Sequence, residues 1–425
     1  MPAFLTAAEA ARRLGVKPAT VYAYVSRGTL ARTRATDGSG SLFDADEIER
    51  LARRGRPRRP AGALDITVES AITEITGDRL RYRGLDVVEL ARTRCYEDIA
   101  TLLWTGGLPP ERLSSPAGSA DQGWLAPAPA LSVGQLAQSA LPERTLPLER
   151  LQVIVPAMAA TDQLRLHLDR PAVMTAARSI IAGMVDCLPA ALSAGQMARE
   201  PDREPAGERA RPSADITPVA ARLWTRLCGR PPSRAALRAL SAALVLLADH
   251  ELAASTLAAR AAASVLADPY AVVGTGLGAV SGALHGGASL GAETLLAAAA
   301  GPADAARVVG DVLRRGEKIP GFGHFVYRTA DPRARLLLDL VRKAVPKSRK
   351  LAVADAILAE VRRRSLPEPN IDFAVATLAA SCGMIRGAGE AVFAVARTSG
   401  WIAHALEAYE SGVPLRPRAA YTGPV

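Results

Sequence analysis

The chain has 425 residues, too many for one ordinary hydrophobic core, so we expect two or three domains. Apolar residues make up 49% of the chain but aromatic residues only 4%, and alanine dominates the apolar set, which favours closely packed helices. The four cysteines lie far apart without a Cys-x-x-Cys pair, so the sequence predicts no metal site and no disulfide framework. No apolar signal core opens the chain, and we expect a soluble, cytoplasmic, all-α protein without a membrane partner.

Positive charge is concentrated towards the N-terminus. Residues 1–60 contain 12 Lys and Arg against 6 Asp and Glu, whereas the remaining residues are nearly balanced and the total is +10. A basic head on a balanced body points to an anionic partner, with nucleic acid as the first candidate. The alternative is a solvated basic linker, because five of these charges are arginines between residues 53 and 59.

Residues 1–53 carry the signals of two short helices, a hairpin and a further helix. Capping boxes begin at Thr6 and Asp44, each with a glutamate three residues later. Pro18 opens the second helix after a tight turn, and residues 37–40 are a hairpin signal. This order resembles the winged helix-turn-helix of the MerR and excisionase type.

The resemblance implies a DNA-binding module whose second helix, residues 19–27, faces the major groove. The side chains that it assigns to the groove are Thr20, Tyr22, Ala23 and Arg27. Arg32 and Arg34 would meet phosphates near the wing. The alternative is a degenerate module that is kept for packing or dimer contacts.

The rest of the chain reads as a basic Pro/Gly linker, residues 54–63, and a mainly helical body, residues 64–425. A short alternating strand at 69–75 continues into a hairpin that ends at 84. Helical periodicity or composition then predicts helices at 86–91, 96–104, 148–164, 178–192, 233–250 and 252–266. Residues 109–145 carry no usable motif, and 194–218 is predicted to be a surface loop. The glycines between 274 and 282 are spaced as if to let two helices touch.

Three of the five histidines lie in or beside one stretch: His250 after an apolar helix, and His285 and His324 among glycines. A neutral histidine can donate an N–H to a developing enolate or alkoxide oxygen. Asp372, among apolar neighbours, suits a general base, and arginine forks suit a di- or tricarboxylate. If these groups converge, they suit carbon–carbon condensation through an enolate. The alternative is that each histidine is simply packed, and for His404 we favour that interpretation.

Residues 66–425 resemble citrate synthases through ordered motifs spread over the whole segment. The matching stretches are LRYRG at 80–84, ADHE at 248–251, DPY at 268–270, HGG at 285–287, GFGH at 321–324, DPR at 331–333, PNIDF at 369–373, ARTSGWIAH at 396–404 and RPR at 416–418. The resemblance implies an all-helical fold with a large domain and a small domain, roughly residues 288–385, that closes over substrate.

The resemblance also implies a role for each matching residue. His285 would donate to the acetyl thioester oxygen while Asp372 removes the α-proton, and His324 would polarise the oxaloacetate carbonyl. The residues implied to hold the oxaloacetate carboxylates are His250, Arg333 and Arg397. Arg416 would reach the neighbouring active site of a homodimer, and Arg328 would contact coenzyme A phosphates. No cofactor is expected beyond acetyl-CoA as substrate.

Two departures from the family pattern lie beside these positions. Ser289, Leu290 and Gly291 stand where an asparagine and an acidic residue usually follow, and residues 374–376 replace a usual Tyr-Ser-Gly. Ser289 also matches a Gly-x-Ser-x-Gly hydrolase pattern, but that elbow needs a preceding buried strand, which this stretch lacks. Two further alternatives stay open: 2-methylcitrate synthesis from propionyl-CoA, and a DNA-binding regulator whose body only senses a carboxylate or acyl-CoA.

Overall fold

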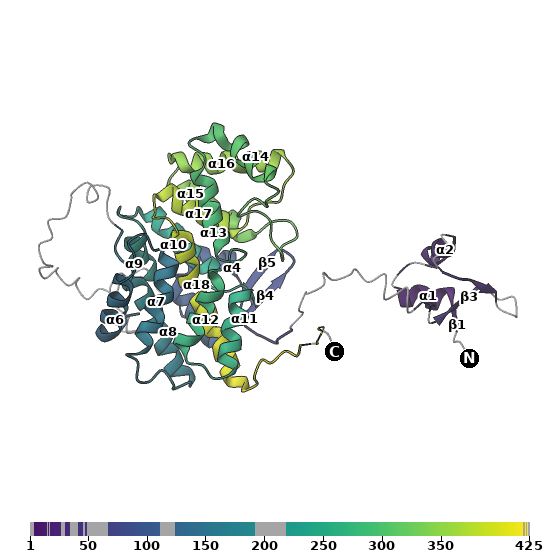
Figure 1. The fold of residues 1–425 in the computed structure, drawn as a ribbon, viewed down its shortest axis with the longest axis horizontal. Coiled ribbons are helices and arrows are strands. Elements are labelled where there is room, and N and C mark those ends of the chain that lie inside the picture. The colour runs from purple at the N-terminus through teal and green to yellow at the C-terminus, as the bar shows by residue number, and fades with distance from the viewer. Residues whose placement is uncertain are drawn as a thin grey trace, which may run out of the picture. The chain divides into compact units, whose positions relative to one another are not determined.

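The computed structural model describes residues 4–14, 16, 18–26, 30–34, 41–45, 47–48, 67–110, 124–191, 218–419, 421 and 423. The chain forms two compact units, Met1–Val68 and Glu69–Val425. Figure 1 draws the first unit in purple and the second from blue to yellow. Each unit has a hydrophobic core of its own.

The first unit is a small helix-turn-helix with a three-stranded antiparallel sheet of order β1-β3-β2. Its described elements are β1 Phe4–Thr6, α1 Ala7–Leu14, α2 Pro18–Ser26, β2 Thr33–Arg34 and β3 Ser41–Asp44. The first capping box forms as predicted, because the Thr6 N–H donates to Glu9 Oε2 (2.9 Å). The Glu47 N–H likewise donates to Asp44 Oδ1 (3.1 Å). Strand β1 was not predicted; it pairs with β3 and extends the wing.

The second unit begins with a small antiparallel sheet of order β4-β5-β6. The strands are β4 Thr73–Thr76, β5 Arg79–Tyr82 and β6 Leu85–Asp86. Gly77, with φ +62°, makes the turn of the β4–β5 hairpin that the sequence predicts. The alternating burial of β5 turns Leu80 and Tyr82 into the core.

Helices make up the rest of the second unit. In chain order they are α4 Val87–Thr93, α5 Tyr96–Thr105, α6 Ala128–Ser139, α7 Pro147–Ala159, α8 Arg170–Asp186, α9 Val219–Leu227, α10 Arg234–Leu247, α11 Ala254–Ser264, α12 Pro269–Val280, α13 Gly287–Ala297, the 3₁₀ turn η1 Pro302–Asp304, α14 Ala305–Arg314, α15 Pro332–Ala344, α16 Arg349–Arg363, α17 Ile371–Cys382 and α18 Ala388–Ser411. Helix α6 was not predicted. Helix α8 begins eight residues before the predicted start at residue 178, because Asp169 caps it by accepting from the Ala172 N–H (3.0 Å). The predicted loop at 194–218 lies outside the described residues except for its last one.

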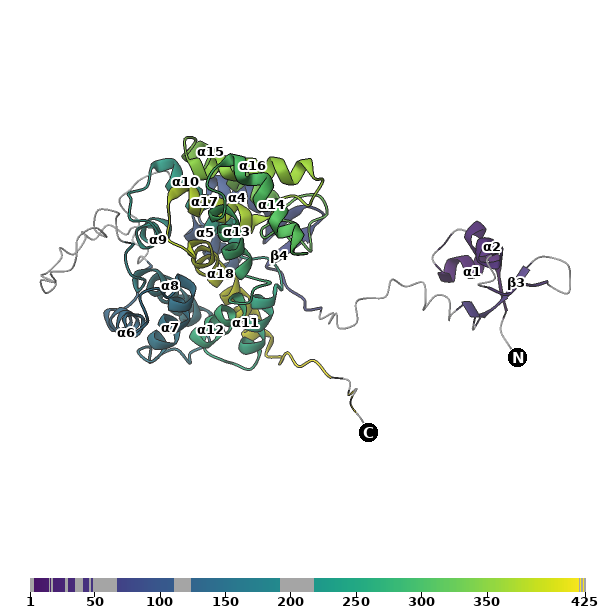
Figure 2. The same ribbon diagram turned by 45° about the horizontal axis from the view of Figure 1, so that its top comes forward.

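Helix α18 runs through the middle of this unit and is buried along most of its length. Helices α13 to α17 gather at one end of the unit, and α6, α7, α8 and α12 at the other (Figures 1 and 2). A Cβ on Gly276 of α12 would stand 2.6 Å from the ring of Trp401 on α18, so that glycine lets the two helices touch. In the described part of the chain, no helix is long and apolar enough to cross a bilayer.

Candidate active site

His250 follows the end of α10 and is buried. The hydroxyl of Tyr82 fixes this turn, because it accepts from the Asp249 N–H (3.1 Å) and donates to the Asp249 carbonyl (3.0 Å). The next residue, Glu251, has φ +50°, a strained conformation for a side chain with a Cβ. His250 Nε2 lies 2.9 Å from the hydroxyl of Tyr327, a residue of the His324 loop. The end of α10 therefore presents one imidazole to a second loop.

The His324 loop owes its shape to two glycines. Gly321 and Gly323 have φ of +81° and +77°, and a Cβ on Gly321 would stand 2.7 Å from that of Phe373. The loop therefore packs directly on the first turn of α17. His324 Nδ1 accepts from the Val326 N–H (3.0 Å), so the ring proton of the neutral imidazole belongs on Nε2. The rings of His324 and His250 lie 5.1 Å apart.

A buried ion pair ties this loop to the start of α17. Arg333 donates two hydrogen bonds of 2.9 Å to the Asp331 carboxylate, a fork–fork pair. Asp331 also accepts from the Ile371 N–H at 2.9 Å, which fixes the residue before Asp372. The Arg333 guanidinium lies 5.5 Å from the ring centre of Tyr327. One carboxylate thus orients an arginine and a helix start together.

Asp372 lies in the first turn of α17, which Asn370 caps by accepting from the Asp372 N–H (3.0 Å). Burial raises the pKa of Asp372 to about 6, with the Asp331 carboxylate adding to the rise and Arg333 and Arg397 opposing it. Such a carboxylate is basic enough to take a proton near neutral pH.

His285 lies in a tight turn before α13. A Cβ on Gly286 would stand 2.5 Å from the Val280 carbonyl, so only glycine fits there. His285 Nε2 lies 2.7 Å from Ser255 Oγ, which accepts from Trp401 Nε1 (3.3 Å). The Ser255 hydroxyl hydrogen is thus available to Nε2, and this pairing leaves the imidazole proton on Nδ1.

Phe393 of α18 separates His285 from Arg397. Its ring centre is 5.4 Å from that of His285, and the Arg397 guanidinium lies 4.6 Å from the same ring. Arg397 is buried and donates from Nε to the Leu247 carbonyl (2.8 Å). Its Nη1 is buried and meets no hydrogen-bond acceptor among the described residues. A buried guanidinium N–H without an acceptor is available to bind an anionic ligand.

The three histidines are neutral at pH 7. Burial and, to a smaller extent, Arg397 lower the pKa of His285 to about 4. Burial and Arg333 lower the pKa of His324 to about 4. Burial, followed by both arginines, holds the pKa of His250 well below its ordinary value. Neutral imidazoles beside two guanidinium groups can donate hydrogen bonds to an anionic ligand.

The structure therefore links six of the predicted residues through contacts and shared electrostatic partners: His250, His285, His324, Arg333, Asp372 and Arg397. Arg416 is exposed on the segment after α18, and the side chain of Arg328 is exposed. His404 is buried between Arg260 Nη1 (3.0 Å) and Asp249 Oδ2 (3.4 Å), in line with the predicted packing role.

Sequence reasoning missed Tyr327, Ser255 and Phe393 as members of the site. Tyr327 is buried, and its ring lies 4.6 Å from that of His324. Its position three residues after the end of the GFGH motif was the one available signal. Ser255 and Phe393 carry no motif and join the site only through packing of α11 and α18.

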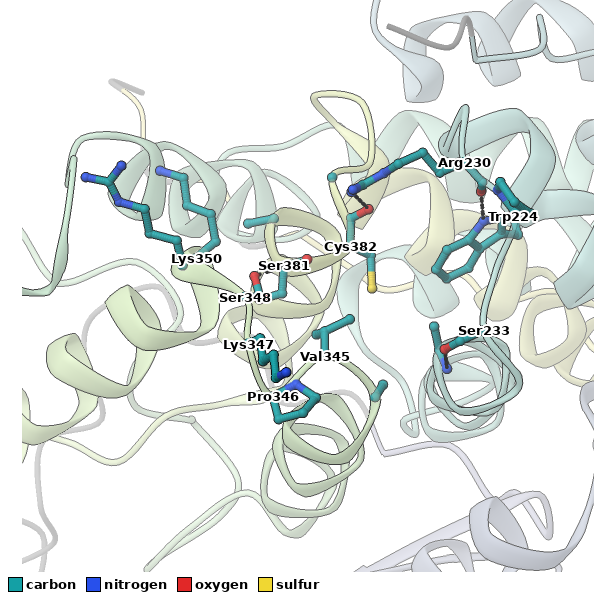
Figure 3. Close-up of a pocket in the computed structure, with 16 residues that line it drawn as sticks. Trp224, Arg230, Ser233, Val345, Pro346, Lys347, Ser348, Lys350, Ser381 and Cys382 are labelled. Carbon is teal, nitrogen blue, oxygen red and sulfur yellow. Dashed lines mark hydrogen bonds between the residues drawn. The ribbon is translucent and has the colours of Figure 1, made fainter.

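The structure has one cavity beside these residues and another that contains none of the predicted site residues, and the two have different linings. A cavity of about 600 Å³ opens beside His324, with a mostly apolar lining of Leu313, Ile319, Phe322, Phe325, Leu366 and Pro367 and with Glu317 and Lys318 as charged members. Another of about 660 Å³, between Trp224 and Arg230 on one side and residues 344–350 on the other, includes none of the predicted site residues (Figure 3). Within the described ranges, no group of three or more His, Cys, Asp or Glu side chains could hold a metal ion.

In the first unit, the predicted DNA-contacting side chains are only partly described. Tyr22 of α2 and Arg32 before β2 are exposed, and Thr20 is half-buried. Arg34 lies in β2, and Ala23 in α2. Arg27 lies outside the described residues.

Comparison with known proteins gives a family for each unit. The family described as "Citrate synthase, C-terminal domain" matches residues 64–418, and "Helix-turn-helix domain" matches residues 4–56. A citrate synthase of Haloferax volcanii is 34% identical over 370 residues, 84% of this chain and 94% of that protein. A citrate/2-methylcitrate synthase of Bacillus subtilis is 28% identical, over 85% of this chain and 95% of that protein.

A solved structure resembles the body closely. Citrate synthase of Thermoplasma acidophilum, in a ternary complex with carboxymethyl coenzyme A and oxaloacetate, has a TM-score of 0.69 and 27% identity, covering 86% of this chain and 96% of its own. The chain therefore belongs to the citrate synthase family, whose members are acyltransferase-type enzymes, and carries a helix-turn-helix domain at its N-terminal end.

Proposed function

We propose that this protein condenses acetyl-CoA with oxaloacetate and water to give citrate and coenzyme A. The observation that carries the proposal is the grouping of neutral His285 and His324, basic Asp372 and the buried guanidinium groups of Arg333 and Arg397. A base, two neutral hydrogen-bond donors and two buried guanidinium groups suit an aldol-type condensation through an enolate.

Each step follows from an atom of the site. Asp372 takes a proton from the methyl group of the thioester, while His285 Nδ1–H donates to the thioester oxygen that gains charge. The enolate carbon then attacks the ketone carbon of oxaloacetate, the C=O π bond opens, and its oxygen, which receives a hydrogen bond from His324 Nε2–H, takes up a proton to become the hydroxyl of citrate. Water hydrolyses the resulting thioester, which releases coenzyme A as the thiol.

Two groups of residues support the substrate positions. His250, Arg333 and the unsatisfied Nη1 of Arg397 suit the two carboxylates of oxaloacetate. The mostly apolar cavity beside His324 suits a pantetheine arm. The side chains of Leu284 and Phe325, each next to a histidine, are fully exposed, which fits loops that an acyl-CoA covers. Arg328 is exposed nearby and suits a coenzyme A phosphate.

We also propose that residues 288–385 form a small domain that closes over the substrates, and that the protein is a homodimer. Apolar side chains at Leu164, Leu166, Val265 and Leu266 are more than half exposed, which favours an interface. Arg416, exposed on the segment after α18, is free to reach a neighbouring subunit. Sedimentation of the wild type tests whether the protein is a dimer, and sedimentation of a variant truncated after Gly412 tests whether the segment with Arg416 contributes to the interface.

The test of the reaction is thiol release from acetyl-CoA in the presence of oxaloacetate, with omission of oxaloacetate as the control. The similarity to a citrate/2-methylcitrate synthase keeps propionyl-CoA as the second candidate substrate. One methylene changes affinity by about 1–3 kcal/mol in an apolar pocket, so the ratio of kcat/KM for the two thioesters decides between them. Background thiol release with both thioesters would refute the proposal.

We further propose that residues 1–53 bind DNA, because a helix-turn-helix with exposed Tyr22 and Arg32 suits groove and phosphate contacts. Titration against genomic fragments at two salt concentrations tests this, since a basic DNA binder weakens as salt rises. If the body acts only as a sensor, oxaloacetate or acyl-CoA will change DNA affinity while thiol release stays at background.

A further inference from the structure

The β4–β5 hairpin lies against both loops that carry the predicted oxaloacetate-binding residues. It is the first regular element of the second unit, and neither of its strands carries a residue of the predicted site. Figure 1 shows it beside the end of the unit where α13 to α17 gather. The hydrogen bonds that leave the hairpin go to two loops that are 70 residues or more apart in the chain.

The strands hold the turn around His250. Thr73 Oγ1 donates to Asp249 Oδ2 at 2.6 Å, and the Ile75 N–H donates to Glu251 Oε1 at 3.1 Å. Tyr82, at the end of β5, bonds both backbone groups of Asp249. The residues on either side of His250 are therefore fixed from one element.

The tip of the hairpin holds the loop after His324. Asp78 Oδ1 accepts from the Arg328 N–H at 2.8 Å and from the Thr329 N–H at 3.4 Å. Between His324 and these two residues lies Tyr327, whose hydroxyl bonds His250. The hairpin therefore contacts both the His250 turn and the loop after His324, and these two segments also contact each other through Tyr327.

The base of the hairpin is tied to α18. The Ala71 N–H donates to Glu407 Oε1 (3.0 Å) on α18, and Glu407 pairs with Arg260 of α11 at 2.8 Å. By contrast, Glu74 lies on the outer face and pairs only within the hairpin, with Arg81 at 2.9 Å and Thr76 at 2.9 Å. The hydrogen bonds towards the site therefore come from strands that are tied to α18 and, through Glu407, to α11. Glu74 on the outer face offers a matched control.

We propose that the β4–β5 hairpin positions the two oxaloacetate-binding loops relative to each other, with Thr73 and Asp78 as its positioning residues. The proposal rests on the function proposed above. Loops without regular structure lose conformational entropy when a ligand orders them. A hairpin that holds them in place beforehand lowers the cost of binding.

The experiment compares Thr73→Val, Asp78→Ala, Asp78→Asn and the control Glu74→Ala in the full chain, by steady-state kinetics and thermal unfolding. Thr73→Val acts on the His250 loop alone, so we expect a rise of about tenfold in KM for oxaloacetate and an unchanged KM for acyl-CoA. Asp78→Ala removes the acceptor of the Arg328 N–H and so loosens the loop that carries both Tyr327, the contact of His250, and Arg328, the proposed contact of coenzyme A. Both KM values should therefore rise. Asp78→Asn keeps one carbonyl acceptor and restores most of the loss, and Glu74→Ala matches the wild type.

Two results would overturn the proposal. One is that Asp78→Ala leaves both KM values within twofold of the wild type. The other is that the variants lower the unfolding temperature and the amount of active enzyme, with both KM values unchanged, as a purely structural role predicts. If the wild type itself releases no thiol, the proposed reaction is refuted and the role of the hairpin is still testable. Calorimetric titration then measures the oxaloacetate affinity of each variant, which should follow the order expected above for KM.

Discussion

Replacement of Asp372 by asparagine is expected to abolish turnover and yet to stabilise the fold. The folded protein raises the pKa of this carboxyl from 3.8 to about 6, chiefly by burial. Asparagine has the same shape and no charge to bury. A residue whose charge serves catalysis is therefore expected to reduce stability at neutral pH.

The magnitude follows from the shift in pKa. A difference of about 2 units corresponds to about 3 kcal/mol, since each unit is about 1.4 kcal/mol. Because the folded-state pKa is the higher one, the folded protein binds the extra proton between pH 4 and 6, and its stability falls as pH rises through that window. Asp372 is partly open to solvent, which screens the charge, so we expect a gain of about 1–3 kcal/mol for Asp372→Asn at pH 8.

Urea unfolding followed by tryptophan fluorescence measures this gain at pH 8 and again near pH 4. The two proteins should differ at pH 8 and nearly converge near pH 4, where the wild-type carboxyl is protonated in the folded state and about half protonated in the unfolded state. Thiol release by the variant should fall about 10²–10⁴-fold, the usual contribution of a general base. A variant that is less stable than the wild type at pH 8, or a difference that does not depend on pH, would refute the reasoning.

Three further outcomes are expected. His285→Ala should lower kcat about 10²–10³-fold, with little change in oxaloacetate affinity by calorimetry, because we propose that its donor acts on the thioester. Arg397→Lys should weaken oxaloacetate binding at least tenfold in the same titration, since lysine cannot replace a buried fork. Burial, and then Glu293 and Glu149, raise the pKa of Glu390 to about 7. Wild-type stability should therefore fall from pH 5 to 8, and Glu390→Gln should lessen that fall in thermal unfolding and leave the part that Asp372 contributes.

Local signals in the sequence predicted local structure well. The capping boxes at Thr6 and Asp44 form because the residues that make them are neighbours in the chain. The β4–β5 hairpin forms at its predicted place for the same reason. Strand β1 and helix α6 were missed because each depends on tertiary contacts: β1 needs β3 as a partner, and α6 packs on α7.

The candidate site could be predicted only as far as its motifs extend. His250, His324 and Asp372 stand in recognisable stretches, whereas their mutual distances depend on packing between α10, the His324 loop and α17. Ser255 and Phe393 escaped prediction because serine and phenylalanine on apolar helices look like ordinary core residues. Their contacts with His285 arise from long-range packing that no local pattern encodes.

The departures from the family pattern lie behind the reacting groups. Ser289 is buried on α13, and a Cβ on Gly389 of α18 would stand only 2.2 Å from its hydroxyl, so serine and glycine share a space that a larger pair would overfill. Residues 374–376 are buried in α17, on the turn after Asp372. His285, His324 and Asp372 keep their own hydrogen-bond partners and backbone supports in spite of these changes. The substitutions therefore bear on how α13, α17 and α18 pack against one another.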